Sequence, residues 1–221
     1  MQAVLFDLDG TLVDTAPDFV LASNELRAQQ QLPLLPAETV AAQVSNGALA
    51  VTKVTFDIDQ QHQDFERHRQ ALLAAYQKHL GSSSLLYPGL QPLLDALAVQ
   101  AIPWGVVTNK PVLYAEPLMQ ALGLHTRCAT LVCPDHVTQR KPDPEGLLMA
   151  ARQLGIDAQR CIYVGDHHRD IEAGKAANMH TVAVNYGYLA GDDDASDWRA
   201  DTVVQTPQEL TTIILQLLAA G

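Results

Sequence analysis

At 221 residues, of which 48% are hydrophobic and 18% charged, the chain has a globular composition, with room for one large domain or for a core and a smaller inserted domain. Its 14 Lys and Arg residues against 25 Asp and Glu residues give a formal net charge of −11 at pH 7. Because this charge repels nucleic acid and anionic membranes, and no Lys/Arg cluster offsets it locally, we expect neither as a partner.

The first predicted element is a short strand at residues 3–6. An apolar run of this length is typical of a strand that is buried on both faces, and this one ends at Asp7 and Asp9. The two carboxylates interrupt the only apolar run near the N-terminus, so we expect no signal peptide. No later stretch approaches the length of a transmembrane helix.

Residues 15–84 follow a different pattern, which predicts helices. Gln, Ala and Leu recur at helical spacing, and no strand-like run is present. The serines that follow Gly81 are typical of a loop and mark the end of the helical pattern and the return to the core. We therefore predict an α-helical cap domain at residues 15–84, inserted after the first strand of a core that comprises residues 1–14 and 85–221.

The rest of the chain alternates between strand-like and helix-like segments. This alternation predicts a parallel sheet covered by helices, which is a Rossmann-like α/β core. A capping box at residues 206–209 predicts one more helix near the C-terminus. The predicted strands are residues 102–107, 130–133, 161–164 and 180–184, and the other predicted helices are residues 90–99, 113–122, 144–154 and 169–177.

The three cysteines are Cys128, Cys133 and Cys161. Their odd number and their spacing fit neither a CxxC motif nor a metal site. Cys133 and Cys161 lie in or beside apolar strand-like runs, where buried free thiols are common. We expect all three thiols to be reduced and structural, which indicates a cytoplasmic protein.

Polar residues follow the predicted strands. Because the carboxyl ends of parallel strands face one shared crevice, residues that are distant in the sequence can converge there. Crowded carboxylates cost free energy unless a cation binds among them, and their oxygens suit Mg²⁺. The residues are Asp7 and Asp9 after the first strand, Thr108 and Asn109 after the second, Lys141 in the loop after the third, and Asp166 and Asp170 after the fourth.

Each of these residues also has an ordinary structural interpretation. Taken singly, the Asp-x-Asp pair is typical of a turn or helix cap, Thr108-Asn109 of a helix cap, and Lys141-Pro142 of a solvated loop. Asp166 with Asp170 is equally consistent with a turn that leads into a helix. Four such coincidences, in order at successive strand ends, favour one site over four unrelated features.

The same residues resemble the four motifs of the haloacid dehalogenase superfamily, and the resemblance covers essentially the whole chain. The predicted insertion is similar to that superfamily's small α-helical cap. Within the superfamily, VVTNKP, KPDP and YGY are similar to phosphoglycolate phosphatases and to relatives that dephosphorylate N-acetylmuramic acid 6-phosphate. The four motifs are DLDGTLVD (residues 7–14), VVTN (106–109), KP (141–142), and VGD (164–166) with Asp170.

The resemblance implies an Mg²⁺-dependent phosphatase whose substrate is a small-molecule phosphomonoester, with N-acetylmuramic acid 6-phosphate and 2-phosphoglycolate as candidates. Asp7 is expected to be the nucleophile that forms an aspartyl-phosphate, which splits one difficult step into two. Asp9 is expected to protonate the leaving oxygen, to activate water afterwards, and to offer its backbone carbonyl to the metal. Asp7 and Asp166 are expected to bind Mg²⁺ through their carboxylates, with Asp170 supporting the metal site.

Substrate binding is assigned to two further groups. Thr108 and Lys141 are expected to hold the phosphoryl oxygens, with Asn109 beside them. Ser45, Asn46 and Gly47 lie where the similar phosphatases carry their substrate-facing cap loop, and we expect them to contact the substrate. The alternative is a simple turn between two helices.

His167 and His168 depart from the pattern of many superfamily members, which have a small or acidic residue here. We interpret both imidazoles as groups that face solvent or support the site from outside its ligand set. The alternative is that one of them adds affinity for a softer metal, or a pH dependence near neutrality.

Two other functions share parts of this pattern. A phosphomutase of the β-phosphoglucomutase type has the same fold and intermediate, and differs mainly in protecting the phosphoenzyme from water. A response-regulator receiver, which is a signalling module, also places carboxylates, a threonine and Lys-Pro at strand ends. A receiver should carry its acceptor aspartate after a middle strand of the sequence and lack a helical insertion, so we favour the phosphatase.

Overall fold

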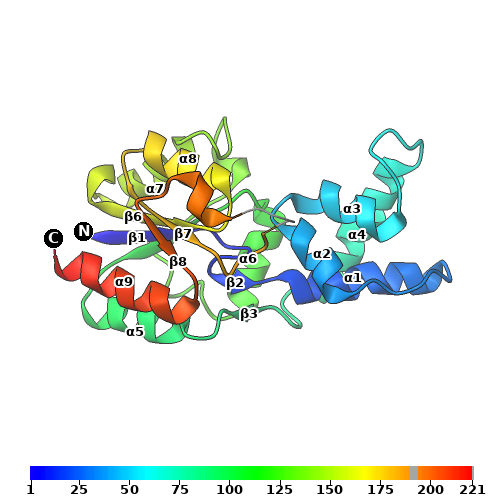
Figure 1. Cartoon of the computed structure of the whole chain (residues 1–221), viewed down its shortest axis with the longest axis horizontal. Helices are drawn as coiled ribbons and strands as arrows, with labels where there is room; N and C mark the ends of the chain where they lie inside the picture. Colours follow the sequence, from blue (N-terminus) through cyan, green and yellow to red (C-terminus); the bar gives the residue numbers. More distant parts are fainter. Residues whose placement is uncertain (190–193, 221) are drawn as a thin grey trace.

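The computed structural model describes residues 1–189 and 194–220, and a parallel sheet forms the centre of the core (Figure 1). The N-terminal strand β1 lies in the middle, because it pairs with β4 on one side and with β6 on the other. The remaining pairings in this sheet are parallel too. In spatial order the strands are β5 (Thr130–Val132), β4 (Trp104–Val107), β1 (Ala3–Phe6), β6 (Cys161–Gly165), β7 (His180–Val184) and β8 (Thr202–Val204).

Helices cover both faces of this sheet. Successive side chains of a strand point to opposite faces, so Val4 and Phe6 pack in one apolar cluster, and Ala3 and Leu5 in another. In Figure 1, α5 and α9 lie below the sheet, and α7 and α8 lie above it. The first cluster includes α5 (Leu90–Val99), α6 (Val112–Ala121) and α9 (Pro207–Ala219), and the second includes α7 (Glu145–Leu154) and α8 (His168–Ala176).

The predicted α/β core is confirmed. Each predicted strand and helix of the core is present, with bounds that differ by at most two residues from those predicted. Strand β8 was not predicted, because it is a three-residue edge strand with only Val204 fully buried, and no long apolar run marks it. The pair formed by β2 (Val13–Asp14) and β3 (Leu85–Leu86) was also not predicted, because a strand of two residues is too short to show an alternating apolar pattern.

The segment between residues 16 and 79, which we call the helical segment, lies beyond the carboxyl ends of the strands (Figure 1). It has an apolar cluster of its own, in which the rings of Phe19 and Tyr76 stack with their centroids 3.8 Å apart. Its helices are α1 (Ala16–Gln29), α2 (Ala37–Val44), α3 (Gly47–Phe56) and α4 (Phe65–His79).

The chain enters and leaves the helical segment at the same place, because β2 pairs antiparallel with β3. The buried carboxylate of Asp18, in the first turn of α1, reinforces this junction. It accepts hydrogen bonds from the backbone N–H groups of Gly81 (2.7 Å) and Ser83 (2.8 Å) and from the hydroxyl of Ser84. A buried carboxylate needs such donors, so they hold the departing helix to the returning chain.

Two further expectations concern thiols and membranes. Cys128, Cys133 and Cys161 are free thiols, and burial raises the pKa of each. Among the described helices, none combines the length and apolar character that crossing a membrane requires.

Candidate active site

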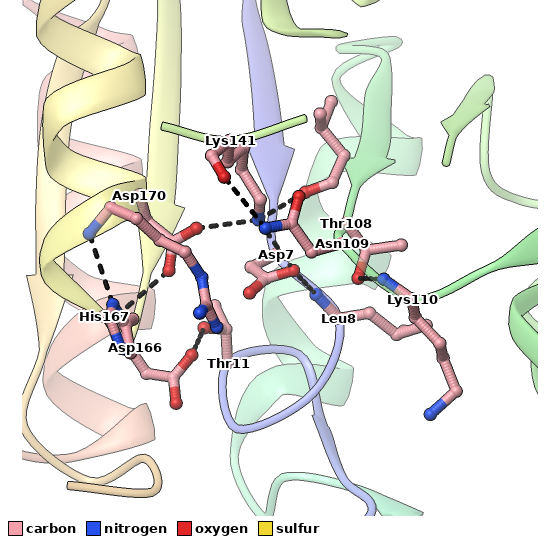
Figure 2. Close-up of polar contacts among 12 residues, drawn as sticks. Asp7, Leu8, Thr11, Thr108, Asn109, Lys110, Lys141, Asp166, His167 and Asp170 are labelled. Carbon is pink, nitrogen blue, oxygen red and sulfur yellow. Dashed lines mark hydrogen bonds and ion pairs between the residues drawn. The ribbon is translucent and has the colours of Figure 1, made fainter. Parts of the chain in front are cut away.

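Three predicted site residues meet at the carboxyl ends of β1 and β6. The backbone N–H of Asp7 donates to the carbonyl of Val164 over 2.8 Å, and this register brings Asp7 next to Asp166. Asp170 belongs to the first turn of α8 and points back toward them (Figure 2). Asp7, Asp166 and Asp170 each offer a carboxylate oxygen within 4.8 Å of the others, and none of the three residues is more than 5% exposed.

Negative charge on these buried, closely spaced carboxylates is costly. Burial, reinforced by the neighbouring carboxylates, raises the pKa of Asp7 to about 6 and that of Asp166 to about 7, although Lys141 opposes the shift at Asp7. Closely spaced carboxylate oxygens are the ligands that a hard divalent ion takes, and such an ion would offset their charge. The donor set therefore fits the predicted Mg²⁺.

Lys141 lies between two of the carboxylates, with Nζ 2.9 Å from Asp7 Oδ1 and 2.7 Å from Asp170 Oδ1 (Figure 2). Its ammonium group also donates to the carbonyl of Val107 (2.9 Å) and contacts the hydroxyl of Tyr163 (2.7 Å). Burial opposes the ammonium charge, but the two carboxylates outweigh it and raise the pKa of Lys141. Lys141 is therefore a fixed cation beside Asp7.

Thr108 and Asn109 follow β4 and lie beside Asp7 and Lys141 (Figure 2). Thr108 Oγ1 accepts the backbone N–H of Lys110 (3.1 Å), which leaves the hydroxyl hydrogen as a donor. Asn109 Nδ2 donates to the carbonyl of Lys141 (3.0 Å) and thereby joins two loops. Within the described part of the chain, Asn109 Oδ1 is buried without a partner, so it is suited to accept a hydrogen bond from a bound molecule.

Lys110 was not predicted as a site residue, although it follows the same strand as Thr108. Its Nζ lies 2.7 Å from Asp9 Oδ1 and 2.7 Å from the hydroxyl of Tyr76 on α4. The hydroxyl of Thr15 donates to the same oxygen of Asp9 over 2.6 Å. These contacts orient the Asp9 carboxylate through Oδ1 and leave Oδ2 for another partner.

The predicted cap loop contacts the candidate metal site. Ser45 lies between α2 and α3, and its hydroxyl donates to Asp166 Oδ2 over 2.8 Å. The guanidinium of Arg169 donates to the carbonyl of Ser45, which ties the same loop to α8. Asn46 is exposed, and Gly47 begins α3 with a φ of 79°, a value that favours glycine. The loop therefore joins the helical segment to the core at Asp166.

Two glycines allow loops to approach Asp166 closely. A Cβ on Gly10 would lie 2.2 Å from Asp166 Oδ2, and a Cβ on Gly187 would lie 2.3 Å from Asp166 Cβ. The hydroxyl of Thr11 donates to Asp166 Oδ1 (3.0 Å), and the backbone N–H of Tyr188 donates to Oδ2 (3.2 Å). Donors from both sides thus orient this carboxylate.

The hydroxyl of Tyr188 reaches the start of the helical segment. It accepts the backbone N–H groups of Thr15 (2.5 Å) and Ala16 (2.7 Å), and it donates to Asp14 Oδ1 (2.6 Å). One residue therefore contacts both Asp166 and the first turn of α1. The sequence signalled Tyr188 only through the YGY resemblance.

The two histidines occupy different positions. His167 is half-buried, and its Nδ1 accepts the backbone N–H of Arg169 (3.3 Å) at the start of α8. His168 is exposed. Among the described residues, the group of side chains that could hold a metal ion includes neither histidine.

A cavity of about 480 Å³ lies between the core loops and the helical segment. Asp7 and Asp9 line it from the core, and Asn46 and Gly47 line it from the loop between α2 and α3. Its volume is within the range of about 300–1,000 Å³ that is usual for small-molecule sites. The acidic residues therefore face a space large enough for a metabolite.

Comparisons with known proteins agree on one family. The chain is 47% identical to the N-acetylmuramic acid 6-phosphate phosphatase of Pseudomonas aeruginosa, over 97% of this chain and 95% of the relative. It is 41% identical to the phosphoglycolate phosphatase of Xanthomonas campestris, over 95% and 94%. A crystal structure from Haemophilus somnus, described as a predicted phosphoglycolate phosphatase, matches with a TM-score of 0.83 and 25% identity, over 97% of this chain and 98% of that one. Residues 4–184 match the model of the haloacid dehalogenase-like hydrolases, and the chain belongs to that family.

Proposed function

We propose that the chain is a Mg²⁺-dependent phosphatase that hydrolyses a small-molecule phosphomonoester through an aspartyl-phosphate on Asp7. Its family and its relatives make it a hydrolase of phosphoric monoesters. The observation that carries the mechanism is the buried contact of Asp7 with Lys141, at 2.9 Å, in a group of three carboxylates. Phosphoryl transfer depends mainly on positioning and charge neutralisation, and this arrangement supplies both.

The first step forms the phosphoenzyme. Asp7 Oδ1 accepts the backbone N–H of Leu8 (2.7 Å) and contacts Lys141, which fixes the carboxylate and leaves Oδ2 to attack phosphorus. A bond forms between Oδ2 and phosphorus while the bond from phosphorus to the ester oxygen breaks. Asp9 donates a proton to that leaving oxygen.

In the second step water attacks the phosphorus, Asp9 accepts a proton from it, and Asp7 is released with inorganic phosphate. Lys141 and the hydroxyl of Thr108 hold the phosphoryl oxygens during both steps. Asp7, Asp166 and the Asp9 carbonyl would hold Mg²⁺, supported by Asp170, and the ion would supply neutralising charge to the phosphoryl group.

We further propose that residues 15–84 act as a cap that selects the substrate, with Ser45, Asn46 and Gly47 in contact with it. The core residues handle the phosphoryl group, which all phosphomonoesters share, so discrimination has to come from elsewhere. N-acetylmuramic acid 6-phosphate is the proposed substrate. The 47% identity to the Pseudomonas aeruginosa phosphatase and a cavity of about 480 Å³ support a sugar phosphate over the smaller 2-phosphoglycolate.

The test is Asp7→Asn, because an amide is a poor nucleophile. The variant should fold as the wild type does, by circular dichroism, and release no phosphate from N-acetylmuramic acid 6-phosphate or p-nitrophenyl phosphate. Beryllium fluoride should bind at Asp7 in the wild type only. A folded variant with substantial turnover would contradict the mechanism, and isomer interconversion without phosphate release would indicate a phosphomutase.

A further inference from the structure

Arg69 on α4 is part of the cavity wall. Arg69, Leu73 and Tyr76 are spaced four and three residues apart, so they share one face of the helix, and all three line the cavity. Tyr76 marks the catalytic end, because its hydroxyl contacts Lys110, which contacts Asp9. Arg69 lies two turns away along α4, or about 10 Å at the rise of an α-helix.

Glu66, which also lines the cavity, pairs with the guanidinium of Arg69 across one turn of α4. Arg69 Nε donates to Glu66 Oε2 (2.8 Å), and Nη2 donates to Oε1 (2.7 Å). These bonds use the side edge of the guanidinium and two of its five N–H groups. In the described part of the chain no other group accepts from Arg69, so the end edge, formed by Nη1 and Nη2, can bind a carboxylate in two-point fashion.

The other cations that line the cavity belong to the core. Lys110 is paired with Asp9, and Arg169 on α8 donates through Nη2 to the carbonyl of Ser45, while its buried Nε has no partner among the described residues. Arg140 is exposed and directly precedes Lys141 in the core loop. Among the described residues, Arg69 is the one cation that the helical segment contributes to the cavity.

We infer that Arg69 binds a carboxylate on the substrate, at a distance from the phosphate that a sugar ring spans; this inference rests on the proposed phosphatase function. In N-acetylmuramic acid 6-phosphate the ring separates the phosphate from the carboxylate, which is carried on an ether at C3. In 2-phosphoglycolate one carbon separates the carboxylate from the ester oxygen, so its acid group stays beside Asp7. The substrate class is therefore an acidic sugar 6-phosphate, and Arg69 determines specificity for the acid.

The test compares two sugar phosphates that differ only in the lactyl ether, N-acetylmuramic acid 6-phosphate and N-acetylglucosamine 6-phosphate. Arg69→Gln should lower kcat/KM for the acidic sugar by about 10- to 100-fold, the effect of a lost charge-assisted hydrogen bond. It should leave kcat/KM for N-acetylglucosamine 6-phosphate and p-nitrophenyl phosphate unchanged. Arg69→Lys keeps the positive charge but lacks the paired N–H groups of a guanidinium, so its kcat/KM for the acidic sugar should lie between those of Arg69→Gln and the wild type.

Arg67→Gln is the matched control. Arg67 is on the same helix and also pairs with a carboxylate, Asp64 (3.4 Å), but its side chain is 74% exposed and is not part of the cavity wall. It should change none of the three activities. Equal losses for both sugars in Arg69→Gln, or no loss for either, would overturn the inference about Arg69. In that case, turnover of p-nitrophenyl phosphate by the wild type would still support the proposed phosphatase function. A wild type that hydrolyses none of the three esters would overturn both.

Discussion

At the scale of single residues, the contact between Lys110 and Asp9 leads to a prediction about proton transfer. Its ammonium group holds Asp9 Oδ1, so Lys110→Met should leave the proposed general acid poorly oriented. The loss should be large, about 100-fold in kcat, for a sugar phosphate, whose alkoxide must be protonated as it leaves. It should be much smaller for p-nitrophenyl phosphate, because p-nitrophenolate leaves without a proton.

The control for this prediction is Lys53→Met, which removes an exposed lysine from α3. It should alter neither activity. A Lys110→Met variant that loses the same factor with both esters would show that Lys110 supports the fold of the site and does not orient the acid.

The candidate residues of the core that the sequence pointed to share one property, which is a position after a predicted strand, whereas Ser45, Asn46 and Gly47 were suggested by the resemblance to known phosphatases. Asp7, Thr108 and Asp166 could be grouped because parallel strands present their carboxyl ends together. Lys110 obeys the same rule, and it was overlooked because no chemistry had been assigned to it. Tyr188 could not be found in this way, since its partners at residues 14–16 are neighbours only in the folded chain.

At the scale of elements, Tyr188 connects the start of α1 to the core. Tyr188→Phe keeps the ring but removes the hydroxyl that accepts the N–H groups of Thr15 and Ala16 and donates to Asp14. The N–H of Thr15 then has no partner among the described residues, and the N–H of Ala16 keeps only its longer bond to Asp14 Oδ1 (3.3 Å). The free energy of unfolding should fall by about 1–3 kcal/mol, measured by urea denaturation. Tyr186→Phe, in the same loop, removes one bond to the carbonyl of Thr11 and should cost less. Equal stability of Tyr188→Phe and wild type would contradict this account.

Which elements could be predicted follows from how much sequence each one occupies. Strands β1 and β6 are buried on both faces and carry apolar runs of four residues, and four of the five residues of β7 are buried, so their pattern is local. Strand β8 has three residues at an edge, and β2 and β3 have two each, so partners distant in the sequence decide their structure. The loop between α2 and α3 was predicted to contact the substrate, with a simple turn as the alternative, but its contact with Asp166 depends on how the helical segment meets the core.

At the scale of the whole molecule, buried carboxylates link stability to pH and to metal. In the metal-free protein, burial raises the pKa of Asp7 to about 6 and that of Asp166 to about 7, from an ordinary value of 3.8. Between pH 3.8 and the raised pKa values of about 6 and 7, the native state binds more protons than the unfolded chain, so stability falls as pH rises. The contribution is fully present below about pH 3.8 and is lost as pH rises through 6 and 7.

Mg²⁺ should reverse this loss, because it binds the deprotonated carboxylates of the native state. We therefore predict that saturating Mg²⁺ raises Tm more at pH 8 than at pH 5, measured by calorimetry against protein treated with EDTA, which should also be inactive until Mg²⁺ is restored. Asp166→Asn removes one proposed ligand and one of the two groups whose pKa is raised. Its metal-free Tm should fall less between pH 5 and pH 8, and Mg²⁺ should no longer raise it. An equal effect of Mg²⁺ at both pH values in the wild type would contradict the assignment of these carboxylates as the metal site.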